Sequence, residues 1–137
     1  MSDEALDGQR ATRTLRPEAE YIGLAAIRDV ISAFYTQARR DPVLGPRFAT
    51  VRDWANHEAR LTHFWWVALG GRAYAAYRYR VVERHRTAGV TEDDLQRWFT
   101  LFGTCVRQRL PGPYAELWLR RARAMGRVLT QVAGKLT

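Results

Sequence analysis

The sequence has one cysteine, one lysine and no apolar run of the length that crosses a bilayer. A lone cysteine cannot form an internal disulfide, and it excludes a zinc cluster built from several cysteines. The N-terminus lacks the apolar centre of a secretory signal. From these absences we expect a cytoplasmic protein without membrane association. Because Cys105 stands among Trp98, Phe102 and Val106, we expect its thiol to be buried rather than reactive.

Acidic residues are scarce relative to basic ones, 14 against 22, which gives a formal net charge of +8. All but one of the basic residues are arginine. A basic domain can bind nucleic acid or an acidic partner. The arginines are scattered over the whole chain instead of forming one block, which favours a solvated surface. Nucleic-acid binding is kept as a competing interpretation of the charge.

The alternation of apolar and polar residues that marks a half-buried strand is also missing, and helical periodicity runs through nearly the whole sequence. A chain of 137 residues with 47% apolar content is large enough for one packed domain. Residues 1–16 are polar and aperiodic. We therefore expect a flexible N-terminal extension over residues 1–16 and a single all-α domain over residues 17–137.

The expected helices of this domain cover residues 18–40, 53–69, about 91–109 and 113–134. Asp53 and Thr91 are suited to N-cap positions, where a side-chain oxygen accepts an exposed backbone N–H. Gly70-Gly71 and Pro111-Gly-Pro113 supply the breaks between helices. Residues 72–90 are less regular and carry three tyrosines among several arginines.

Two of the three histidines, His57 and His63, lie on the second of these helices. Six residues turn a helix through roughly 600°, so the two side chains point to different faces and do not form the zinc pair of an HExxH helix. His57 shares the apolar face with Leu61 and Phe64, whereas His63 lies off that face and is expected at the surface. Taken alone, His57 is either a hydrogen-bonded core histidine or a side chain that faces a ligand.

The third histidine, His85, follows His57 by 28 residues on a separate segment. Two histidines on two helices, both flanked by aromatic residues, can enclose a planar cofactor. Haem iron takes a proximal histidine on one face, and polar groups on the other face determine how it treats a small ligand. Haem is therefore one candidate for the group that His57 faces.

Several motifs, taken in order, match a known family over roughly residues 24–133. They are Phe34-Tyr35, Asp41-Pro-Val-Leu-Gly-Pro-Arg-Phe48, Trp54-x-x-His57, Phe64-Trp65, Tyr77, His85 and Trp98-Phe-x-Leu-Phe102. In this order and spacing the chain resembles a truncated haemoglobin of group III, a short bacterial globin that packs helices two over two around haem. The resemblance implies an all-α, globin-like, truncated two-over-two helical sandwich with haem b as its cofactor.

The resemblance also implies roles for individual residues. His85 would be the proximal iron ligand, and Phe48 would pack on the haem face. The other haem contacts that it implies are Arg60, as the partner of a propionate, Leu61 and Phe64.

On the distal side, the resemblance implies a pocket formed by Tyr35, His57 and Trp98. These side chains offer an O–H, a ring nitrogen and an indole N–H. Donors that converge in a dry pocket stabilise negative charge on a ligand and slow the release of O₂. His57 could coordinate iron, gate the pocket or do neither, and the residues leave these alternatives open.

The segment before His85 departs from the family pattern. Members usually carry Tyr-x-Gly-x-Pro there, whereas this chain has Tyr77-Arg-Tyr79-Arg-Val81. Two additional residues separate Trp65 from Tyr77, and Gly70-Gly71 at that place resembles group II of the same superfamily.

The function that follows from the resemblance is a haem globin that binds O₂ and related diatomic ligands. Redox detoxification of nitric oxide or peroxide, by dioxygenase- or peroxidase-like chemistry, would need an electron donor, and the chain shows no flavin or nicotinamide motif. A basic helical regulator that binds nucleic acid without haem is the alternative, and it predicts binding with a steep salt dependence. A globin-fold module that has lost haem is a third interpretation, against which His85 counts.

Overall fold

The computed structural model describes residues 16–136, with the side chains of residues 16–131. Its elements are α2 (Glu18–Ile22), α3 (Leu24–Ala38), the 3₁₀ turn η1 (Gly45–Phe48), α4 (Trp54–Ala68), α5 (Val81–Thr87), α6 (Glu92–Arg109) and α7 (Gly112–Leu136). No strand occurs among these residues, which confirms the predicted all-α class. None of the described helices is both long and apolar enough to span a membrane. The predicted extension over residues 1–16 falls outside the described residues, apart from Arg16.

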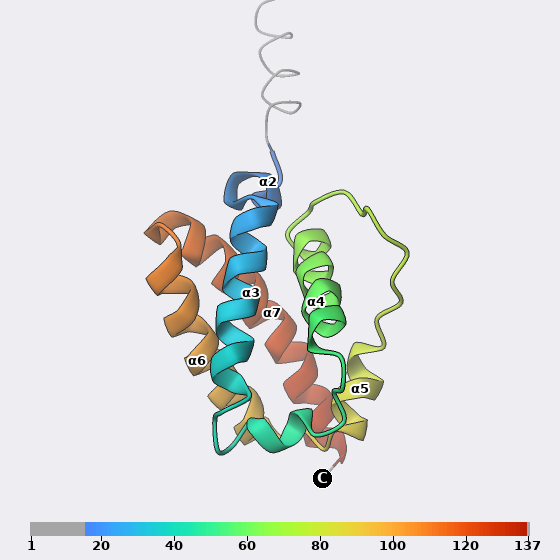
Figure 1. Ribbon diagram of the computed structural model, residues 1–137. Coiled ribbons are helices and arrows are strands. Elements are labelled where there is room, and N and C mark those ends of the chain that lie inside the picture. Colours follow the sequence, from blue (N-terminus) through green and yellow to red (C-terminus); the bar gives the residue numbers. More distant parts are fainter. Residues whose placement is uncertain (1–15, 137) are drawn as a thin grey trace, which may run out of the picture.

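The four long helices form two pairs that pack on each other, as predicted. α3 lies beside α4, α6 lies beside α7, and α3 also packs against α6 (Figure 1). Large aromatic side chains fill the space between the pairs, and Phe34, Phe102 and Trp118 are completely buried. Cys105 lies in the same core, as predicted, with its Sγ 3.9 Å from the carbonyl oxygen of Val30. Burial raises the pKa of the Cys105 thiol, so the reactive thiolate is disfavoured.

The expected single helix over residues 18–40 is wrong, because the chain breaks at Gly23. Gly23 has a φ of +91°, a conformation that L side chains rarely adopt. The short helix α2 therefore runs in its own direction and packs across the ends of α4 and α7. Its Ala19 N–H donates to the carbonyl of Leu69 at 3.0 Å, which ties the start of the domain to the end of α4.

Helix α4 begins and ends where its sequence predicts. The Asp53 carboxylate accepts the N–H of Asn56 at 3.0 Å, as an N-cap does. Gly70 has a φ of +93°, and a Cβ there would lie 2.7 Å from Pro17. A Cβ on Gly71 would overlap the indole of Trp66, whose Nε1 donates to the Arg72 carbonyl at 2.8 Å. Both glycines are thus required for the chain to leave α4 at this point.

Helix α6 begins after Thr91, the N-cap that the sequence predicts, and the structure adds a capping box there. The Thr91 hydroxyl accepts the Asp94 N–H, and the Asp94 carboxylate accepts the Thr91 N–H. The same carboxylate lies 2.7 Å from the Nε of Arg47, on η1. The start of α6 is thereby fixed to the turn that carries Phe48.

A second carboxylate joins α6 to the chain that follows α3. One oxygen of Asp41 accepts the backbone N–H groups of Val43 and Leu44, each at 3.0 Å. The other oxygen accepts two hydrogen bonds from the Arg97 guanidinium, at 2.6 and 3.1 Å. The Asp41 side chain is only 6% exposed. The hydrogen bonds from Arg97, and then the one from the Leu44 backbone, hold the pKa of this carboxyl below its usual range.

This geometry predicts a pH-dependent loss of stability for Asp41→Asn. Because the folded-state pKa of Asp41 is depressed, its contribution is present above the unfolded-state pKa of about 3.9 and disappears as the pH falls through the folded-state value. We expect the substitution to lower the free energy of unfolding by about 1–2 kcal/mol at pH 7, since charged hydrogen bonds are lost. Urea unfolding at pH 7 and at pH 3 measures this, and the difference between variant and wild type should shrink at pH 3.

The matched control is Glu116→Gln, which removes a carboxylate that is half exposed and 3.3 Å from Arg107. Exposed ion pairs contribute little, so this variant should unfold almost like the wild type. Equal losses in the two variants, or a loss in Asp41→Asn that does not depend on pH, would contradict the assignment.

Candidate functional site

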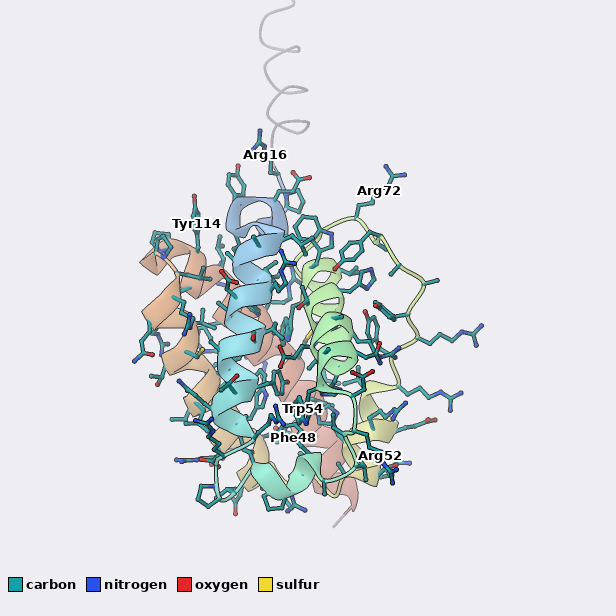
Figure 2. All side chains as sticks on the ribbon, in the orientation of Figure 1. Arg16, Phe48, Arg52, Trp54, Arg72 and Tyr114 are labelled. Atoms are coloured by element: carbon teal, nitrogen blue, oxygen red, sulfur yellow. The ribbon has the colours of Figure 1, made fainter. Side chains whose placement is uncertain are left out.

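Aromatic side chains from α3, η1 and the start of α4 form one cluster. The ring of Tyr35 lies 5.6 Å from that of Phe48 and 5.9 Å from that of His57, in both cases edge to face. Trp54 packs against Phe48 at 5.5 Å and against His57 at 5.2 Å. Figure 2 shows Phe48 and Trp54 together, between η1 and the first turn of α4. The structure thus brings together three of the predicted site residues, Tyr35, Phe48 and His57, and adds Trp54.

Trp98, from α6, completes this cluster next to Tyr35. Its indole stacks on Phe102 at 4.5 Å and meets the edge of Phe34 at 5.5 Å. Tyr35 is 6% exposed. Burial raises the pKa of Tyr35 to about 12, although the hydrogen-bond donor Trp98 partly offsets that rise. The Tyr35 phenol is therefore protonated at neutral pH and has an O–H to donate.

His57 is half-buried on α4, and its electrostatic environment includes α5. Burial lowers the pKa of His57 below its ordinary value, and the positive charges of Arg60 and Arg84 lower it further. Arg84 belongs to α5, so charges of α5 act on the face of α4 that carries His57. At neutral pH the ring is consequently uncharged, with one nitrogen as donor and the other as acceptor.

His85 lies on α5 with one ring nitrogen already engaged. Its Nδ1 is 2.6 Å from the carbonyl oxygen of Val81, one turn earlier in the helix. A carbonyl can only accept, so Nδ1 carries a proton, and in the neutral imidazole the lone pair is then on Nε2. Within the described part of the chain, Nε2 has no hydrogen-bond partner. A histidine in this state is ready to bind a metal ion through Nε2.

Comparison with known families shows which family the chain belongs to. Residues 19–121 match the family model described as bacterial-like globin. The chain belongs to this family. A search among curated proteins gave no match. The family supports a haem-binding globin, consistent with binding of diatomic gases, and gives no support to the alternative of a nucleic-acid-binding regulator.

The residues of this globin fit a haem. The hydrogen bond at Nδ1 gives the neutral imidazole of His85 the tautomer that an iron ligand requires. Helix α5 packs closely on α7, whereas α4 is not among its close neighbours in residues 16–136, so α4 and α5 can face a cofactor from two sides. Apolar and aromatic side chains that are only partly buried, among them Phe48, Leu61 and Phe64, lie on the α4 side.

His63 is not at the surface, so that expectation is wrong. It is 2% exposed, because the segment between α4 and α5 folds back over it. The N–H of Tyr74 donates to Nε2 of His63 at 3.2 Å, and Nδ1 of His63 lies 2.6 Å from the hydroxyl of Tyr79. That hydroxyl donates to the carbonyl of Arg60 at 3.1 Å. Both nitrogens of His63 are therefore used within the protein.

Arg60 is directed toward the same segment. Its guanidinium donates to the carbonyl of Arg78 at 2.6 Å and lies over the rings of Tyr77, at 4.9 Å, and Tyr79, at 5.6 Å. Phe64 also packs against Tyr79, with 5.2 Å between ring centroids. The role of Arg60 as a propionate partner stays a prediction.

Sequence reasoning gave no role to Trp54, Tyr79 or Arg84. For Trp54 a signal exists, because its spacing of three residues from His57 places both on one side of a helix. Tyr79 and Arg84 carry no such signal, because the contacts that matter span 16 residues or more.

The charges around His57 predict a measurable pKa. In NMR titration of the apoprotein, His57 should titrate below the ordinary value of about 6.5. Arg84→Gln removes a positive charge that opposes protonation, so it should raise the pKa of His57. Arg86→Gln makes the same charge change on the same helix and should leave that pKa nearly unchanged. A pKa of His57 that responds equally to both substitutions would contradict the proposed closeness of Arg84.

Proposed function

We propose that this globin holds haem b through His85, binds O₂ and related diatomic ligands on the side of Tyr35, His57 and Trp98, and uses them in redox detoxification. The observation that carries the proposal is the hydrogen bond from His85 to Val81, which leaves Nε2 free to bind iron. Noncovalent haem b is favoured because covalent attachment of c-type haem uses two cysteines and the chain has one. The order of Tyr35, Phe48, His57 and Trp98 along the chain supports membership of truncated group III.

A haem iron, when bound, supplies a coordination position for a diatomic ligand and a centre that can change oxidation state. The protein contributes hydrogen-bond donors near that position. Packing on Phe34 holds the buried Tyr35 phenol and the partly buried Trp98 indole in place, so they need little reorganisation when a ligand gains negative charge. The uncharged His57 ring offers one further donor or acceptor.

Such donors retain O₂ rather than release it, which suits a reaction better than transport. For nitric oxide the balanced conversion is NO plus O₂ plus one electron to nitrate. Reduction of a peroxide would instead consume two electrons and two protons. It would give water and an alcohol, or two molecules of water from hydrogen peroxide. Both conversions need an external electron donor, which we expect to be a separate reductase.

The first test concerns the iron ligand. Purified protein loaded with haemin should show a Soret band. The variant His85→Gly should lose this band or change it strongly, because it lacks the imidazole that is proposed to bind the iron. Addition of imidazole to His85→Gly should restore the spectrum by replacing the missing side chain. A protein that takes up no haemin, or a spectrum that is the same in wild type and His85→Gly, would overturn the proposal.

The second test concerns the distal donors. Tyr35→Phe and Trp98→Phe should each raise the O₂ dissociation rate roughly five- to tenfold, the equivalent of about one hydrogen bond. Stopped-flow displacement of O₂ by CO measures the rate. Tyr114→Phe is the matched control, because this tyrosine lies on α7 far from Phe48 and Trp54 (Figure 2). A fast rate that neither distal substitution changes would exclude the donor role.

A further inference from the structure

The segment that joins α4 to α5 is held to α4 by side chains of the segment and side chains of α4. We propose that His63 and Tyr79 are positioning residues that fix the start of α5, and through it the ring of His85. This inference rests on the proposed role of His85 as the iron ligand. The contacts that carry it are the hydrogen bonds that join His63, Tyr79 and the carbonyl of Arg60, here called the loop anchor.

The directions of these hydrogen bonds follow from the donors and acceptors available. Nε2 of His63 accepts the N–H of Tyr74, so it carries no proton. The neutral ring must then hold its proton on Nδ1 and donate to the Tyr79 oxygen at 2.6 Å. The Tyr79 hydroxyl uses its own proton for the Arg60 carbonyl. Each donor thus has one acceptor: Tyr74 N–H donates to His63, His63 donates to Tyr79, and Tyr79 donates to the Arg60 carbonyl.

Two further contacts hold the same segment. The guanidinium of Arg60 donates to the carbonyl of Arg78, the residue before Tyr79. The ring of Tyr79 packs edge to face on Phe64, which belongs to α4. Figure 2 shows Arg72, nearer the start of the segment, pointing away from the body of the protein. The segment is thus attached at its start, where Trp66 donates to the Arg72 carbonyl, and again at residues 74–79, next to α5.

Helix α5 needs such an attachment, because it has little stability of its own. It has seven residues, none of which is buried, and its N-cap residue Arg80 makes no side-chain capping hydrogen bond. Isolated helices of that length are not stable in water. The glycine and proline that family members usually carry before the proximal histidine are missing here, since Tyr79 and Val81 occupy those positions.

Tyr79, which the loop anchor holds, lies two residues before Val81. Val81 is the first residue of α5, and its carbonyl accepts the proton of His85 Nδ1. When Tyr79 is fixed on α4, Val81 is fixed as well, and the orientation of the His85 ring follows from it. Loss of the loop anchor should therefore change the iron–histidine bond without touching His85 itself.

Tyr79→Phe tests this most cleanly, because it removes the hydroxyl and keeps the ring on Phe64. Tyr77→Phe is the matched control, since the Tyr77 hydroxyl makes no hydrogen bond within the described residues. His63→Leu removes the other partner, and His63→Gln should restore part of the effect because an amide can both donate to Tyr79 and accept from Tyr74. Thermal unfolding of each apoprotein checks that the variants fold.

Two measurements are made on these proteins. Limited trypsin digestion of the apoprotein reports on the segment through cleavage after Arg72, Arg78 and Arg80. Resonance Raman spectroscopy of the ferrous haem protein reports on the iron–histidine stretching band. We expect Tyr79→Phe and His63→Leu to be cut about fivefold faster, as for the loss of one hydrogen bond, and to shift or broaden the band, with Tyr77→Phe like the wild type.

Faster cleavage with an unchanged band would show that the loop anchor does not position His85, and would overturn the inference while the proposed function stands. Unchanged cleavage in Tyr79→Phe would also overturn it, because the segment would not depend on the hydroxyl. If the wild type shows no Soret band that depends on His85, the proposed function is wrong. Faster cleavage of Tyr79→Phe than of Tyr77→Phe would then show only that the hydroxyl of Tyr79 attaches the segment to α4.

Discussion

The hydrogen bond from His85 Nδ1 to the Val81 carbonyl is the interaction on which the proposed haem site depends. It determines which ring nitrogen holds the proton, and so which nitrogen is left to bind iron. The opposite tautomer would present an N–H where a lone pair is needed. Because donor and acceptor lie one turn apart in α5, this hydrogen bond orients the His85 ring only when that helix is formed. The site therefore depends on whatever holds α5 in place.

The three histidines differ in what their surroundings leave available. His63 uses both nitrogens to hold the segment before α5, so none is left for a ligand. His85 uses one nitrogen and keeps the other. His57 is kept uncharged by burial and by the charges of Arg60 and Arg84. Sequence position alone does not separate these roles, since His57 and His63 share one helix.

Features that depend on neighbours in sequence could be predicted. The caps at Asp53 and Thr91, the glycine end of α4 and the buried Cys105 all rest on local patterns, and the structure has them. The break at Gly23 was missed, because the apolar stripe continues on both sides of it. The burial of His63 could not be predicted, because it results from a segment without regular structure that returns over α4. Helical periodicity carries no information about such a return.

The arginines show why a charge count is a poor guide to a partner. Arg97 donates twice to one buried carboxylate, and Arg47 pairs with the capping Asp94. Arg60 donates to the carbonyl of Arg78, and its guanidinium lies over the rings of Tyr77 and Tyr79. A lysine has a compact ammonium group, and it could not make the forked contact of Arg97 with one carboxylate oxygen. These arginines hold η1, α6 and the segment before α5 in place. At these three positions arginine thus has a structural role, and the charge that it brings says nothing about a partner.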